Sequence, residues 1–116
     1  MLAMLERDSA LLGNRNRTAV LVAIRLLGET WPSELASLLG LRLYSVQRIL
    51  EAYDREGALV SRTMGRTRRI SLNPRYVVHR ELDALLWKLG QHDVALQSRL
   101  AARRRRPRRA SKPGRK

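Results

Sequence analysis

The chain has 116 residues with 24 Lys or Arg against 10 Asp or Glu, a formal net charge of +14 at neutral pH. This length suits one domain with short extensions, and an apolar fraction of 44% without any Phe predicts an aliphatic core. The absence of Cys excludes disulfides, thiolate metal sites and cysteine nucleophiles.

The positive charge is concentrated in two places. Residues 103–116 contain nine Lys or Arg and no acid, which leaves 15 basic and 10 acidic residues in 1–102. Residues 57–80 contain six Arg and no acid. Such clusters favour a polyanionic partner, with nucleic acid ahead of an anionic membrane surface.

The chain carries no signal for the membrane or for export. Its longest purely apolar run, 19–24, is far too short to cross a bilayer. Residues 1–12 place charged side chains where a signal peptide is apolar. We therefore expect a cytoplasmic, nucleoid-associated protein without membrane contact.

The first third of the chain predicts three helices. Residues 1–12 are weakly amphipathic and predict a short helical extension. Apolar residues at helical spacing predict a second helix between Gly13 and Gly28. Trp31-Pro32-Ser33-Glu34 begins a third, because Pro suits the first turn of a helix and Glu suits the positive end of its dipole. Gly40 ends this helix, and a turn follows.

A strongly amphipathic helix and a hairpin come next. Residues 44–56 carry apolar side chains at i, i+3, i+4 and i+7, namely Val46, Ile49, Leu50 and Tyr53. Gly57 is a favourable C-terminal stop. Two alternating runs, 58–63 and 67–72, predict strands joined at Met64-Gly65-Arg66.

The C-terminal third predicts further helices and then a tail. A helix is expected to begin between Val78 and Glu81, and we expect Gly90 to interrupt it. Residues 94–100 suggest another, loosely patterned helical segment. From Arg103 the composition is of low complexity and predicts disorder in the free protein.

This order of elements resembles the winged-helix transcription regulators of the ArsR type, over roughly Gly13 to Leu89. The resemblance rests on four segments: Ser33-Glu34-Leu35-Ala36, Ser45-Val46-Gln47-Arg48-Ile49-Leu50, Glu56-Gly57-Ala58-Leu59-Val60 and Arg69-Ile70-Ser71-Leu72. It implies a mainly α fold with a small β-hairpin (α+β), a winged helix-turn-helix flanked by N- and C-terminal helices. The expected divisions are a helical extension at 1–12, the winged helix-turn-helix at 13–76, a C-terminal helical region at 77–102 and a disordered basic tail at 103–116.

The same resemblance implies a homodimer that represses transcription from an operator. Residues 1–12 and 82–100 are the expected dimer interface, because such domains pair through their terminal helices. Metal-sensing members of the family use Cys, and this chain has none. We therefore expect no metal or other cofactor.

Helix 44–56 is predicted to enter the major groove of duplex DNA. Arg48 can pair with guanine N7 and O6, and Gln47 can pair with adenine. Tyr44 and Ser45 suit phosphates or a thymine methyl, and Arg42 in the preceding turn suits a phosphate. The alternative is that these residues are only the solvated face of an amphipathic helix.

The hairpin is predicted to act as a basic wing. Arg62, Arg66, Arg68 and Arg69 surround Gly65, and arginine suits the negative potential of the minor groove and its phosphates. Strand alternation places Arg66 and Arg68 on one face of the hairpin and Arg69 on the other, so Arg69 is not expected to have the same binding role as the other two.

The tail is predicted to add affinity without sequence information, through Arg103, Arg104, Arg105, Arg106, Arg108 and Arg109 among its basic residues. RNA or an anionic protein is the alternative partner for the tail. Enzyme activity is not expected, and His79, Glu81, Asp83, His92 and Asp93 are better explained as surface residues than as metal ligands. Trp31 and Trp87 are expected to pack, partly buried.

The favoured function is therefore sequence-specific regulation of transcription by a DNA-binding protein. One alternative is an architectural, nucleoid-associated protein that coats DNA without a preferred site. A second alternative is a winged helix used to bind RNA or another protein.

Overall fold

A computed structural model describes the backbone of residues 10–105 and the side chains up to residue 103. Within that range the chain forms five helices and one antiparallel pair of strands, a mainly helical α+β fold as the sequence predicted. The elements are α2 (Arg15–Leu27), α3 (Pro32–Leu39), α4 (Leu43–Glu56), β1 (Leu59–Met64), β2 (Thr67–Leu72), α5 (His79–His92) and α6 (Val94–Arg105).

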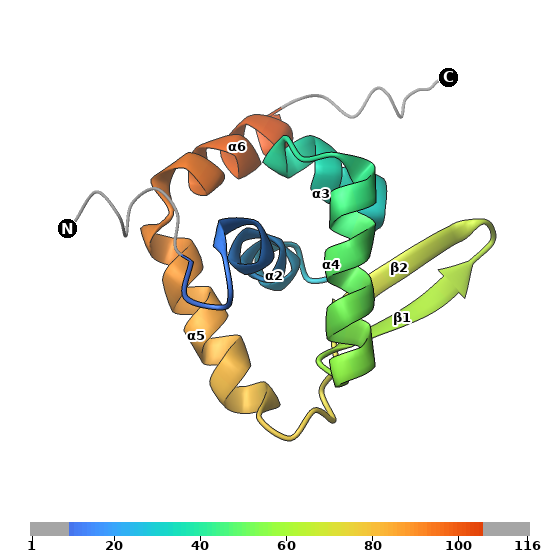
Figure 1. Cartoon of the computed structure of the whole chain (residues 1–116). Helices are drawn as coiled ribbons and strands as arrows, with labels where there is room; N and C mark the ends of the chain where they lie inside the picture. The colour runs from blue at the N-terminus through green and yellow to red at the C-terminus, as the bar shows by residue number, and fades with distance from the viewer. Residues whose placement is uncertain (1–9, 106–116) are drawn as a thin grey trace.

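Helix α2 is the centre of the molecule. Figure 1 shows it surrounded by α3, α4, α5 and α6. Every residue from Val20 to Ile24 is buried, whereas most helices bury only one stripe. The side chain of Asn14 caps the helix by accepting a hydrogen bond of 2.8 Å from the backbone N–H of Arg17.

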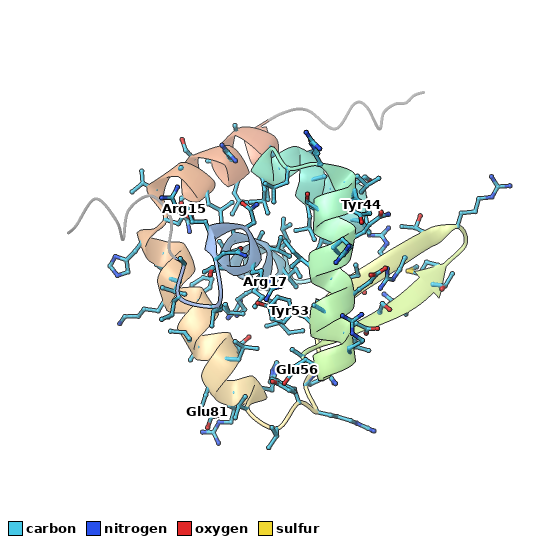
Figure 2. All side chains as sticks on the ribbon, viewed as in Figure 1. Arg15, Arg17, Tyr44, Tyr53, Glu56 and Glu81 are labelled. Atoms are coloured by element: carbon cyan, nitrogen blue, oxygen red, sulfur yellow. The ribbon has the colours of Figure 1, made fainter. Side chains whose placement is uncertain are left out.

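Helix α4 buries the predicted apolar face. Val46, Ile49 and Leu50 lie in the core. Tyr53 is half-buried, on the side of α4 that faces α2, and its hydroxyl donates a 3.0 Å hydrogen bond to the carbonyl of Leu12 (Figure 2). Burial raises the pKa of Tyr53 above its ordinary value.

The hairpin forms as predicted, except that β1 begins and ends one residue later than expected. Its base is tied to the segment between α2 and α3. Thr30 and Ile70 exchange two backbone hydrogen bonds, of 3.0 and 2.7 Å, and both residues are buried. This bridge sets where the hairpin leaves the helical body.

Two expectations about the C-terminal third are wrong. Gly90 does not interrupt a helix, because α5 runs unbroken from His79 to His92. Helix α6 continues to Arg105, three residues into the segment expected to be disordered. The physical reason for the second error is that arginine is a good helix former and Arg103 finds an acidic partner on α3.

The division at residue 77 also differs from what the structure shows. Leu86, Leu96 and Leu100 are buried in the same core as α2 and α4, so α5 and α6 are integral to the domain. The apolar stripe expected to form a dimer interface is therefore largely covered within the chain. Leu85 and Trp87 remain exposed on α5.

Parts of the predicted termini lie outside the described residues, namely 1–9 of the helical extension and 106–116 of the tail. Residues 10–14, which are described, form a turn leading into α2. Among residues 10–105, no helix is both long and apolar enough to cross a membrane.

Gly90 is needed because α2 approaches α5 closely at this position. A Cβ atom added to Gly90 would lie 2.9 Å from both methyl carbons of Leu26. Gly90→Ala is therefore expected to lower the free energy of unfolding by about 1–2 kcal/mol, although alanine favours a helix by about 1 kcal/mol. Urea unfolding measures this change.

The control repeats the substitution in a Leu26→Ala background. There the added methyl meets no obstacle, and alanine should stabilise the protein by up to about 1 kcal/mol. An equal effect of Gly90→Ala in both backgrounds would show that Leu26 is not the cause.

Candidate nucleic-acid interface

An open groove lies between α4, the hairpin and the beginning of α3. Residues from all three elements line it: Trp31, Pro32, Ser33, Leu43, Gln47, Arg66, Thr67, Arg68 and Arg69. Four of the residues predicted to contact DNA are thus brought together from two separate segments of the sequence. Figure 1 shows the hairpin projecting from the helical body beside α4.

The outward face of α4 carries the other predicted contacts. Tyr44, Gln47 and Arg48 are exposed, Ser45 is half-buried, and Arg42 is exposed at the N-cap. Figure 2 shows Tyr44 near the N-terminal end of α4. These side chains project from the first turns of the helix, the part that reaches base edges when a helix enters the major groove.

Arg48 and Tyr44 interact on this face. Nη1 of Arg48 donates a 2.9 Å hydrogen bond to the Tyr44 hydroxyl oxygen, and the guanidinium carbon lies 5.7 Å from the centroid of the ring. This hydrogen bond raises the pKa of Arg48 above its ordinary value. The Nε–Nη2 edge takes no part in the bond and can pair with guanine N7 and O6.

The strand register divides the hairpin arginines between two faces. Arg62 pairs with Arg69 across the strands, so their side chains share one face. Arg68 lies on the other face, together with the buried residues Ile70 and Leu72. The expected separation of Arg68 from Arg69 is confirmed.

Arg62 is already paired within the chain. Its Nε and Nη2 donate to the two carboxylate oxygens of Glu29, at 2.9 and 3.1 Å. Both side chains are substantially exposed, so the pair stabilises the fold only slightly. The composition of residues 57–80 does not indicate this partner, because Glu29 precedes Arg62 by 33 positions in the chain.

Arg69 is held against a tryptophan. Its guanidinium carbon lies 4.7 Å from the centroid of the Trp31 ring, a cation–π geometry. The Nε atom of Arg69 is buried and makes no hydrogen bond to the residues that the structure describes. Trp31, expected to pack partly buried, also lines the groove.

The tail arginines are only partly described. Nη2 of Arg103 forms a 2.9 Å ion pair with Glu34 of α3. The side chains of Arg104 and Arg105 and all of Arg106, Arg108 and Arg109 lie outside what the structure describes.

The residues considered as metal ligands do not form a site. Among the described residues, no three His, Asp or Glu side chains come together in a way that could hold a metal ion. Asp83 instead forms a 2.7 Å ion pair with Nε of Arg25, whose guanidinium also lies over the ring of Trp87.

Comparisons of the chain with protein-family models, with curated proteins and with solved structures each found no match. The chemistry of the groove is therefore the basis for assigning a function. The groove combines three hairpin arginines, of which Arg66 is exposed and Arg68 and Arg69 are half-buried, with the exposed amide of Gln47 on α4.

Proposed function

We propose that this protein is a winged-helix DNA-binding protein that regulates transcription at specific sites. The observation that supports this most strongly is that Gln47 of α4 and Arg66 and Arg68 of the hairpin line one groove. In this reading α3, the turn and α4 form the helix-turn-helix, α4 enters the major groove, and the hairpin is the wing on the neighbouring minor groove or backbone.

The geometry favours duplex DNA over duplex RNA. The major groove of B-form DNA admits an α-helix, whereas that of A-form RNA is deep and too narrow for side chains to read. The exposed side chains of α4 include an amide and a guanidinium, the two groups that recognise adenine and guanine by paired hydrogen bonds. Duplex DNA is therefore the partner that uses both elements of the groove.

A homodimer is part of the proposal. Leu85 and Trp87 leave exposed apolar surface on α5, at 37% and 46% of their accessible area. A two-fold dimer would place two copies of α4 on half-sites about one helical turn apart. The bound sequence should then be a palindrome.

A second candidate function is architectural coating of DNA. It is favoured by the small set of base-reading side chains, Gln47 and Arg48, against the large number of basic residues in the chain. In that case the phosphate contacts would dominate and sequence preference would be weak.

Selection from a random duplex library separates these functions. The full chain is incubated at near-physiological salt with duplexes that carry a randomised central segment, and the retained molecules are sequenced. An enriched palindrome supports a dimeric site-specific regulator. Retention without a motif supports the architectural function, and no retention of duplex would leave an RNA or protein partner as the alternative.

Arg48→Ala tests direct base recognition. We expect about tenfold to hundredfold weaker binding to the selected site, with a smaller change on unrelated DNA, because a bidentate contact to a base is lost. Competition binding with both duplexes measures the ratio. Arg55→Ala is the matched control, since it removes the same charge from the last turn of the same helix. If Arg48→Ala weakened binding to both duplexes equally, Arg48 would be a phosphate contact.

A further inference from the structure

Residues 29–31, between α2 and α3, contact the hairpin one after another. Thr30 is the centre of this contact, because its backbone exchanges two hydrogen bonds with that of Ile70 in antiparallel pairing. Antiparallel pairing makes Trp31 and Arg69 the next opposed residues, and opposed residues place their side chains on the same face. The backbone pairing therefore brings the ring of Trp31 to within 4.7 Å of the guanidinium carbon of Arg69.

Arg69 keeps its hydrogen-bonding capacity in this arrangement. A cation–π contact uses the face of the guanidinium, whereas the N–H groups lie in its plane and remain able to donate. Nε is the nitrogen of Arg69 that is buried without a hydrogen bond. Nη1 and Nη2 make no hydrogen bond to the described residues, so they are the donors that a ligand can reach.

The neighbouring Arg62 has a different environment. It is opposed to Arg69 across the strands, yet two of its nitrogens are held by Glu29 at 2.9 and 3.1 Å. Arg69 and Trp31 line the groove, and Arg62 does not. Glu29 thereby reduces the repulsion between two adjacent guanidinium groups and leaves Arg69 as the member of the pair that can take an anion.

We propose that Arg69, held by Trp31, binds a backbone phosphate of the DNA that occupies the groove. The ligand class is a phosphodiester, because the planar guanidinium fork matches the geometry of two phosphate oxygens. Arg66 and Arg68 line the same groove, so the site adds to cations already present there. The inference rests on the proposed function of the groove and assigns to Trp31 the role of a positioning residue.

The physical basis is pre-organisation. An arginine loses side-chain freedom when it is fixed on a ligand, and this loss opposes binding. Trp31 already restricts Arg69 in the free protein, so less freedom is lost when a phosphate binds. The half-buried position of Arg69 also reduces the screening of its charge by water and salt. Both effects strengthen the contact without changing the net charge, and both depend on the ring.

Trp31→Leu and Arg69→Gln test this assignment as a double-mutant cycle. The four full-length proteins are the unaltered chain, each single variant and the double variant. Affinity for a duplex of about three helical turns, long enough for two half-sites, is measured at several salt concentrations. Urea unfolding shows that each protein is folded.

Arg69→Gln should weaken binding about fivefold to tenfold and make the slope of log K against log salt shallower by about 0.9, the contribution of one phosphate. Trp31→Leu leaves the net charge unchanged and should weaken binding about threefold to fivefold. Added to Arg69→Gln, it should change the affinity less than about twofold, because the site that the ring serves is already lost.

Two conservative variants separate the positioning role from charge and from bulk, and they replace Trp31→Leu if that protein does not fold. Arg69→Lys keeps the charge but loses the planar group, so binding should stay at least about threefold weaker than that of the unaltered chain. Trp31→Phe keeps an aromatic face for the cation and should stay within about twofold of the unaltered chain.

Arg62→Gln is the matched control, because it makes the same change of charge on the same face of the hairpin. Arg62 is held by Glu29 and lies outside the groove, so the affinity should change less than about threefold and the slope should not change. A slope change equal to that of Arg69→Gln would overturn the inference, because the slope would then report overall charge and not one site.

Three other results would contradict the inference. Equal weakening by Trp31→Leu with and without Arg69→Gln would mean that Trp31 acts through the shape of the groove. An unchanged salt slope in Arg69→Gln would mean that no phosphate contact is lost. Full affinity of Arg69→Lys would mean that charge alone is sufficient. Failure of the unaltered chain to bind duplex DNA would instead remove the proposed function, on which the inference rests.

Discussion

Replacing Arg66 and Arg68 together with alanine is expected to weaken binding to duplex DNA about tenfold to hundredfold. The slope of log K against log salt should become shallower by about 2, since each phosphate contact contributes about 0.9. Both residues line the groove beside α4. Titrations at several salt concentrations give the affinity and the slope together.

Arg62→Ala is the matched control, because it removes a hairpin arginine that is paired with Glu29. Its guanidinium would have to leave a carboxylate to reach a phosphate, so the net gain from a DNA contact is small. We expect a change below about threefold in affinity and no measurable change in the slope. A larger effect of Arg62→Ala than of the double replacement would mean that the opposite face of the hairpin meets the DNA.

The second large effect concerns stability. Leu86→Ala is expected to lower the free energy of unfolding of the whole domain by about 2–5 kcal/mol. Leu86 of α5 is fully buried in the core that α2 and α4 share, and the truncation leaves a cavity there. Urea unfolding followed by circular dichroism should still show a single transition, because α5 is part of the same cooperative unit.

Leu85→Ala is the control on the neighbouring residue. Leu85 is 37% exposed, so the same chemical change should cost less than about 1 kcal/mol. Two separate transitions in the Leu86→Ala protein would support the division at residue 77 that the sequence suggested. Similar costs for the two substitutions would mean that α5 is less tightly packed than described.

The helices and strands could be predicted because their signals are local. The apolar side chains of α4 recur at helical spacing, and the face they define is the buried one. The glycines that end α3 and α4, Gly40 and Gly57, adopt the left-handed conformation that such ends require. These features depend on residues within one or two turns of each other, which a sequence displays directly.

Gly90 shows why a local signal can mislead. Glycine is a poor helix residue, so its presence predicted an interruption. Its actual role is to let Leu26 of α2 pack against α5, a contact between residues far apart in the chain. No pattern within α5 contains that information, because the neighbour belongs to another helix.

For the hairpin arginines, too, local sequence patterns predicted one part of the outcome and long-range contacts decided the other. Their positive charge and the face of each strand residue followed from composition and alternation. Composition and alternation did not show which of these arginines lack a partner within the chain. Glu29 pairs with Arg62 and Trp31 packs on Arg69, and both come from the segment before or at the start of α3. Charge counting within the hairpin therefore overestimated the number of unpaired cations.

The sequence by itself determined the α+β class, the order of the elements and the basic character of the surface, because helix periodicity, strand alternation and charge are properties of short segments. The tertiary structure decided which cations are paired, that α5 and α6 complete the core, and that α6 contacts α3 through Arg99 and Arg103. These outcomes depend on distances between residues such as Glu34 and Arg103, which are 69 positions apart. Only packing of the whole chain brings such residues together.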